Sequence, residues 1–230
     1  MDINDRRIQE AVRHTEILRA PRQTLSTFGI TNVYYYLVTK PVYCELEKGT
    51  TETVIREGRV IAEKPRVVTP YYLSNLEGFS LEAKKYFEML FNTYGSNAPG
   101  LFYTYKNEPK ELNIVSDDLI SVVNKLNDKI DKRGDPLTSI IKGEDALWDV
   151  SLMKFIYELT LNSVKGNLQE MESRGLLNID ADGITTDIRM NIEESFQKTA
   201  NGDFAPAELK AELDRWGVFT EYQDRFFTLF

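Results

Sequence analysis

Apolar and polar positions change their period along the chain, and each change predicts a different kind of structure. Residues 2–20 repeat apolar positions every three or four residues, with Ile8 and Ala11 on one side, which predicts an amphipathic helix that ends at Pro21. From residue 28 the pattern becomes β-branched and aromatic, which favours strands. We therefore expect an antiparallel sheet of three or four strands after the first helix.

The strand-like region carries its own turn signals. Residues 28–49 form the first run, which Pro41 interrupts or marks as an edge. The dipeptide Glu57–Gly58 lies between two short alternating runs and predicts a tight hairpin with Gly58 at positive φ. Further short strands are expected at 66–69, 101–105 and 111–115, the last two joined by a turn at 106–109.

Helical periodicity returns at residue 80 and dominates from Ser116 onward. One helix is predicted over 80–95, where it is placed to cover the sheet. Further helices are expected at 116–134, 144–166, 167–177, 187–202, 205–217 and 218–230. The predicted fold class is α+β, with a small N-terminal antiparallel sheet and flanking helices followed by an all-helical C-terminal half.

Charge and tyrosine content differ between the two halves of the 230 residues. The net charge is −8, which divides into +2 for residues 1–110 and −10 for residues 111–230. Ten of the twelve tyrosines lie between Tyr34 and Tyr105. This shift predicts a tyrosine-rich α+β lobe at 1–115 and an acidic helical lobe at 116–230, as two lobes or one continuous domain.

Several classes of protein are disfavoured by what the sequence lacks. His14 is the only histidine and Cys44 the only cysteine, so neither a disulfide nor a Cys/His zinc cage can form within one chain. We expect His14 at an exposed or interface position and Cys44 as a buried thiol, with no metal and no cofactor. The motifs GxGxxG, GxxxxGK[ST], GxSxG and HExxH are absent, and there is no apolar leader or membrane-spanning run, so we expect a cytoplasmic protein.

Three consecutive tyrosines in TNVYYYLVTKPVY form the first candidate site. In a strand Tyr35 would point with Val33 and Leu37 into a core, whereas Tyr34 and Tyr36 would share the other face. Tyrosine combines a large apolar ring with a polar hydroxyl, which suits binding surfaces. Two interpretations stay open: the helix at 80–95 covers this face, or Tyr34 and Tyr36 bind a partner or ligand.

Nucleic acid is disfavoured as a partner. The first helix carries Arg6, Arg7, Arg13 and Arg19, and aromatic side chains beside a basic groove can bind single strands. However, the first half sums to only +2 and the whole chain is acidic, which repels a polyanion.

The segment Asn178–Arg189, NIDADGITTDIR, resembles the first half of a calcium-binding EF-hand loop. Asn178, Asp180 and Asp182 stand at the first, third and fifth places, and Gly183 stands at the sixth, where the loop turns sharply. The twelfth place holds Arg189 instead of a bidentate glutamate, which removes two oxygen ligands and adds repulsion. An ordinary connection between helices is the alternative.

The C-terminus is the second candidate site. Trp216, Phe219, Phe226 and Phe230 can lie close to one helical stripe, although chain ends are usually polar. These aromatic residues either pack against the protein's own helices or anchor a second subunit or another protein.

Two function classes follow. The first is a non-catalytic interaction or regulatory protein that presents these aromatic residues to a protein partner or to itself as a homo-oligomer. The second is a carboxylate-dependent enzyme or small-ligand binder with its site between the sheet and the acidic helical half. A concave pocket where acids and tyrosines converge would favour the second class, and a flat apolar patch would favour the first.

Overall fold

The computed structural model describes residues 3–45, 51–69, 71–72, 75 and 100–229. Their contacts divide the chain into two compact units. Unit 1 combines residues 1–64 with 103–167, and unit 2 combines residues 65–102 with 168–230. Each unit contains residues from before and from after Ser116. The domain boundary that the composition shift predicts at Ser116 stays a prediction.

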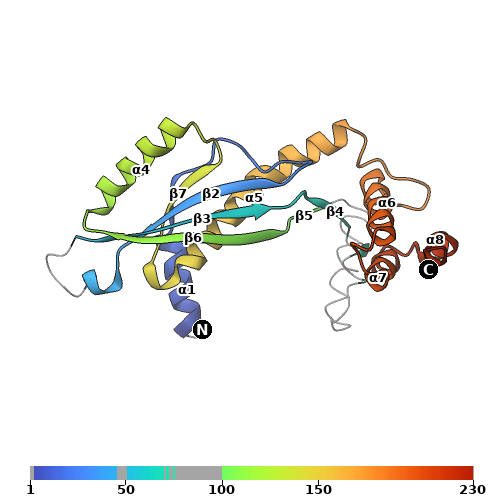
Figure 1. Cartoon of the computed structure of the whole chain (residues 1–230), viewed down its shortest axis with the longest axis horizontal. Coiled ribbons are helices and arrows are strands. Elements are labelled where there is room, and N and C mark those ends of the chain that lie inside the picture. The colour runs from blue at the N-terminus through green and yellow to red at the C-terminus, as the bar shows by residue number, and fades with distance from the viewer. Residues whose placement is uncertain (1–2, 46–50, 70, 73–74, 76–99, 230) are drawn as a thin grey trace. The chain divides into compact units, whose positions relative to one another are not determined.

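Unit 1 is built on a five-stranded sheet (Figure 1). Its strands are β1 (Glu16–Arg19), β2 (Thr31–Thr39), β3 (Thr53–Ala62), β6 (Tyr105–Val115) and β7 (Thr138–Lys142). Their order is β1-β7-β2-β3-β6. Pairing is antiparallel except between β2 and β7, which run parallel. The predicted α+β class is confirmed, but the sheet is mixed because β7 comes from the half expected to be helical.

The helices of unit 1 begin and end at recognisable signals. They are α1 (Ile3–His14), α4 (Leu119–Arg133) and most of α5 (Trp148–Ser173), with short 3₁₀ turns at Val42–Glu45 and Asp145–Leu147. Asp118 caps α4 by accepting hydrogen bonds from two backbone N–H groups, and Gly134 ends it at φ 68°. Within the described residues, we find no helix that combines the length and the apolar character needed to cross a membrane.

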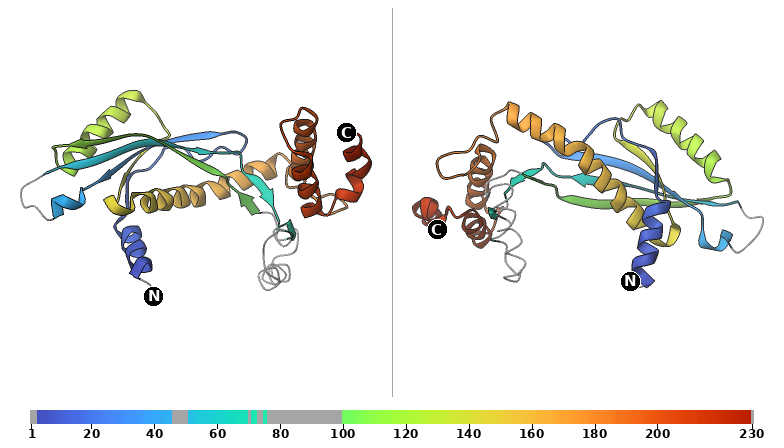
Figure 2. Two further views of the ribbon diagram at one scale, coloured as in Figure 1. Left: turned by 60° about the horizontal axis from the view of Figure 1, so that its bottom comes forward. Right: turned by 180° about the vertical axis from the view of Figure 1, so that it is seen from behind.

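Strand β2 is the centre of the sheet, and its alternating side chains build two different cores. Val33, Tyr35 and Leu37 pack with apolar residues of α5, whereas Tyr36 and Val38 pack with apolar residues of α4. Figure 2 shows α4 and α5 on opposite sides of this sheet. The prediction that Tyr35 faces a core with Val33 and Leu37 is confirmed.

The hairpin expected at Glu57–Gly58 is wrong, because both residues lie inside the continuous strand β3. Gly58 pairs with Tyr35 in the sheet, and a Cβ at position 58 would overlap the Tyr35 ring. The missing side chain lets that ring lie across β3, so that the Tyr35 hydroxyl donates a 3.0 Å hydrogen bond to Asn107 Oδ1 on β6. The glycine therefore serves close packing rather than a turn.

Other predicted boundaries also need correction. The turn expected at 106–109 lies inside β6, where Pro109 sits beside a bulge on an edge strand, a position that tolerates proline. The first helix ends at His14, and Glu16–Arg19 is strand β1. The two helices expected at 144–177 form one helix, α5.

Unit 2 has a two-stranded sheet of β4 (Arg66–Val68) and β5 (Gly100–Phe102) and the helices α6 (Thr186–Ala200), α7 (Pro206–Trp216) and α8 (Phe219–Phe227). The helices agree with the predicted ranges, and Pro206 stands in the first turn of α7. The helix predicted over 80–95 lies outside the described residues.

Replacing Gly58 by alanine should destabilise the protein, because the new methyl group would overlap Tyr35. We expect the free energy of unfolding in urea to fall by about 1–3 kcal/mol, the usual cost of overpacking. Gly29→Ala is the matched control, since a Cβ there would meet its nearest neighbour at an ordinary 3.6 Å. Equal stability of the two variants would contradict the packing role of Gly58.

Candidate functional site

The strand register of unit 1 places a row of polar side chains on the α4 side of the sheet. Tyr34 pairs with Arg59, and Arg59 pairs with Glu108, so these three share one row across β2, β3 and β6. Tyr36 pairs with Glu57 in the neighbouring row. Because α4 ends at Gly134, it covers the Tyr36 row and leaves the Tyr34 row open.

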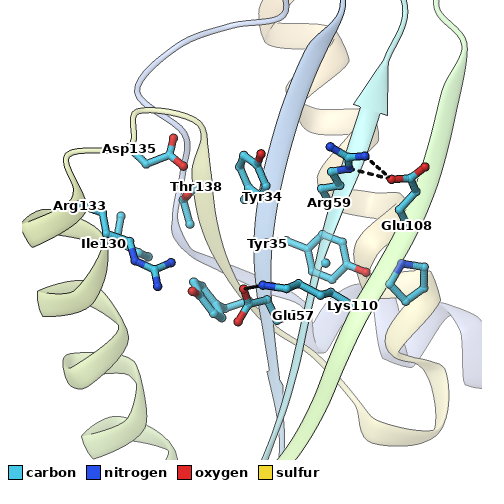
Figure 3. A pocket seen from close by; sticks show the side chains of 13 residues that line it. Tyr34, Tyr35, Glu57, Arg59, Glu108, Lys110, Ile130, Arg133, Asp135 and Thr138 are labelled. Atoms are coloured by element: carbon cyan, nitrogen blue, oxygen red, sulfur yellow. Dashed lines mark hydrogen bonds and ion pairs between the residues drawn. The ribbon is translucent and has the colours of Figure 1, made fainter.

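A cavity of about 380 Å³ opens at this place (Figure 3). This volume falls in the range of about 300–1,000 Å³ that small-molecule sites occupy. Its lining comes from four strands of the sheet (β2, β3, β6 and β7), from α4 and from the connection between α4 and β7, all within unit 1. The lining residues are Tyr34, Tyr35, Tyr36, Glu57, Gly58, Arg59, Glu108, Pro109, Lys110, Ile130, Arg133, Asp135 and Thr138.

One wall of the cavity is an ion pair between neighbouring strands. Arg59 Nε and Nη2 each lie 2.7 Å from Glu108 Oε2, and Lys106 Nζ lies 2.8 Å from Glu108 Oε1. Hydrogen bonds from Lys106 and Arg59 hold the pKa of Glu108 below its usual value, and the bond to Glu108 raises the pKa of Arg59. Both groups therefore stay ionised near neutral pH.

A second ionic contact lies on the neighbouring row. Lys110 Nζ is 3.3 Å from Glu57 Oε1, and Lys129 Nζ is 4.0 Å from Glu57 Oε2. The Lys129 ammonium also lies 5.0 Å from the centre of the Tyr36 ring, a cation–π distance. The carboxylate of Glu57 thus holds a lysine of the edge strand and a lysine of α4 over the same part of the sheet.

The two tyrosines that the sequence predicts as one binding face both line the cavity but differ in exposure. The Tyr34 side chain is exposed, with 42% of its surface accessible, and lines the cavity. Tyr36 is 4% exposed and packs under α4 with Ile130 and Ile140. The helix that covers this face in the described structure is α4, whereas the helix expected to do so at 80–95 lies outside the described residues.

The C-terminal aromatic residues lie in unit 2, and two of them are buried there. Trp216 stacks on Tyr72 at 4.3 Å between ring centres and donates a 3.1 Å hydrogen bond to Glu212. Burial and the neighbouring Glu212 raise the pKa of Tyr72 to about 12. These contacts favour the interpretation that the aromatic end packs against its own helices.

The remaining described aromatic residues of that site, Phe219 and Phe226, lie on α8. Phe226 is buried and meets Phe219 edge-on at 5.6 Å, and Phe219 is half-buried beneath the Lys210 ammonium. Phe230 lies outside the described residues. An anchoring role for these side chains toward a second protein stays a prediction.

The loop from Asn178 to Arg189 contains the EF-hand-like turn, and the guanidinium of Arg189 contacts its carboxylates. Gly183 adopts φ 82°, and Asp180 Oδ1 accepts hydrogen bonds from the Asp182 and Ile184 N–H groups at 3.0 and 2.9 Å. The Arg189 guanidinium lies 2.8 Å from Asp180 Oδ2 and 3.0 Å from Asp182 Oδ2. It therefore binds two of the carboxylates that the resemblance assigns to calcium.

Arg189 also joins this loop to helix α8. Its Nη1 lies 2.7 Å from both carboxylate oxygens of Glu221 and 3.1 Å from the Tyr222 hydroxyl. Partial burial acts to lower the pKa of Arg189, but the hydrogen bonds to Glu221, Tyr222 and Asp180 outweigh it and raise the pKa. One side chain thus holds the loop and a helix of unit 2 together.

Metal ligands are sparse in the part of the chain that the structure describes. It contains no group of three or more histidine, cysteine or acidic side chains arranged to hold a metal ion. The exposed His14 contacts Glu144, as expected for a surface histidine. The Cys44 side chain lies outside the described residues.

Sequence reasoning missed most of the cavity. Arg59, Glu108, Lys110, Arg133 and Asp135 were not among the predicted site residues. The first three lie on β3 and β6, where the expected turns at 57–58 and 106–109 broke the alternation that would have placed them on one face. Arg133 and Asp135 flank the end of α4. That this end faces the sheet follows from strand β7, which the sequence pattern did not predict.

No protein-family model matches the chain, and no curated protein or solved structure is similar to it. The function is therefore argued from the geometry of the cavity alone.

Replacing Arg189 by glutamine should weaken unit 2, because three carboxylates would lose their shared cation. Hydrogen bonds to charged groups contribute about 1.5–3 kcal/mol, so we expect a loss of that order in the free energy of unfolding in urea. Lys198→Gln is the control, because Lys198 makes a single exposed pair with Glu194, a kind worth about 0–1 kcal/mol. A similar loss in both variants would refute the central role of Arg189.

Proposed function

We propose that the chain binds a small organic molecule in the cavity between the sheet and α4 of unit 1. The observation that carries the proposal is a concave space in which one exposed tyrosine ring converges with charged side chains from both sheet and helix. Small-molecule sites combine such apolar walls with a few placed polar groups. A flat aromatic patch, which would favour an interaction protein, is not what the Tyr34 and Tyr36 face provides.

Binding explains this site better than general acid catalysis does. A carboxyl group that donates a proton near neutral pH needs a raised pKa. Glu108 has a lowered pKa and is held by two cations, so it is fitted to be a fixed negative charge. The proposal therefore takes the ligand-binding form of the second function class and assigns no reaction.

An interaction surface is the second candidate function, and it rests on a different part of unit 1. Met153, Tyr157 and Leu161 follow one another at a spacing of four on α5 and are 65%, 63% and 54% exposed. Three large apolar side chains in a stripe suit contact with another protein or a second copy. This stripe is a better candidate for an interaction surface than the Tyr36, Trp216 and Phe226 side chains, because those three are buried.

Native mass spectrometry of the whole chain can separate the two candidates. The protein would be incubated with the small-molecule fraction of a cell extract, desalted, and weighed intact and after denaturation. We expect an added mass of a few hundred daltons that is lost on denaturation. Tyr34→Ala should raise the dissociation constant about tenfold, which corresponds to ~1.4 kcal/mol, and so lower the bound fraction.

Tyr157→Ala is the matched control for Tyr34→Ala, because it removes another exposed tyrosine that does not line the cavity. It should leave the added mass unchanged. Equal loss in both variants, or no added mass in the unaltered protein, would contradict the ligand site. A dimer that only Tyr157→Ala dissociates would favour the interaction surface instead.

A further inference from the structure

We infer that the ligand of this cavity is a small zwitterion, such as an amino acid or a short peptide, held by Arg133 through its carboxylate and by Asp135 through its ammonium group. The inference rests on the proposed function, because it names the chemistry of the molecule that the cavity takes. It starts from the charges of the lining side chains and from the partners that each of them has.

Six charged side chains line the cavity, three of each sign, so their formal charges cancel. Four of them are already paired within the sheet, Arg59 with Glu108 and Lys110 with Glu57. Arg133 and Asp135 are different: neither forms an ion pair with the other or with any further residue in the described part of the chain. The cavity therefore offers one positive and one negative group that remain available to a ligand.

The local backbone brings these two groups to the same end of the cavity. Arg133 is the last residue of α4, Gly134 turns the chain at φ 68°, and Asp135 begins the connection to β7. Figure 3 shows Arg133 reaching from the end of α4 toward the cavity and Asp135 lying on the connection that follows. A positive φ at Gly134 reverses the chain direction within one residue, so that both side chains can face the sheet.

Asp135 is held in place without using its charge. Its Oδ1 accepts a 2.9 Å hydrogen bond from the Leu137 N–H group, and the residue is half-buried. In the described structure Oδ2 has no hydrogen-bond partner, so it can accept from an ammonium group. Arg133 is exposed and presents a planar fork of donors, which matches the two oxygens of a carboxylate.

A ligand with one kind of charge fits this site less well. A simple anion would contact Arg133 but would lie near the unpaired carboxylate of Asp135, and a simple cation would meet the opposite conflict. The chain's net charge of −8 adds to the repulsion of anions. A zwitterion satisfies both groups at once, and its side chain can lie against the exposed Tyr34 ring.

The test uses compounds that share one side chain and differ only in their charges. L-phenylalanine is compared with phenethylamine, which lacks the carboxylate, and 3-phenylpropionate, which lacks the ammonium group, and the same trio is built for leucine and methionine. Binding to the whole protein is followed by NMR of the labelled methyl groups of Ile130 and Thr138, which line the cavity. We expect at least one zwitterion to bind about tenfold or more tightly than both partners of its trio.

Variants assign each charge to its residue. Arg133→Met should reduce the affinity for the zwitterion to that for the matched amine, while Lys132→Met, a neighbouring cation outside the lining, should change neither. Asp135→Asn keeps the oxygen that accepts from Leu137 and should reduce the affinity for the zwitterion to that for the matched acid. Unchanged methyl signals far from the cavity show that each variant is folded.

The outcomes separate the two proposals. If an acid or an amine binds as tightly as its zwitterion, or if Arg133→Met and Lys132→Met behave alike, the ligand class is wrong while the cavity remains a binding site. If no compound shifts the Ile130 or Thr138 signals and the intact protein also takes up no small molecule, the proposed function itself fails.

Discussion

The packing of the Tyr35 ring over Gly58 determines the register of the central strand β2 and which helix each of its two faces contacts. Once Tyr35 lies across β3 and reaches Asn107 on β6, three strands are tied in one register. A shift by one residue would exchange the two faces of β2 and place the Tyr35 ring under α4. The two cores, the cover provided by α4 and the open row at Tyr34 all depend on this register.

The open cavity follows from the length of one helix. Helix α4 covers Tyr36 and ends at Gly134, so among the described residues no helix lies above the next row of the sheet. That row carries Tyr34, Arg59 and Glu108, whose polar tips can be exposed without cost. The same helix end supplies Arg133 and Asp135, which explains why the charges with no ion partner in the described structure gather at this place.

Patterns that depend on local periodicity could be predicted from the sequence, and contacts between distant segments could not. The α+β class, the burial of Tyr35 and the helices α6, α7 and α8 follow from alternation, helical spacing and capping residues. Gly58 and Pro109 resemble turn residues, and only their partners show that one admits an aromatic ring and the other stands at a bulge on an edge strand. Strand β7 was missed because a five-residue segment with only two apolar residues, Ile140 and Ile141, has no distinct period inside helical sequence.

The candidate site shows the same limit. Tyr34 was found because alternation places it on the opposite face from Tyr35, but the difference in exposure between Tyr34 and Tyr36 depends on where α4 ends. The charged lining was missed because its members come from strands far apart in sequence. In unit 2 the aromatic residues were recognised correctly as unusual, and the partner that buries Trp216 is Tyr72, well over a hundred residues earlier.

Nitration of the native protein with tetranitromethane, mapped by tandem mass spectrometry of its peptides, tests the central claim most directly. The claim is that the side chains of three consecutive tyrosines on β2 lie in three environments: Tyr35 in the core on the α5 side, Tyr36 in the core under α4, and Tyr34 exposed at the cavity. Tyr34 should react at a rate similar to that of the exposed Tyr157, while Tyr35 and Tyr36, at 1% and 4% exposure, stay unmodified until the protein unfolds. Rapid nitration of Tyr35 or Tyr36, or protection of Tyr34 while Tyr157 reacts, would contradict the account.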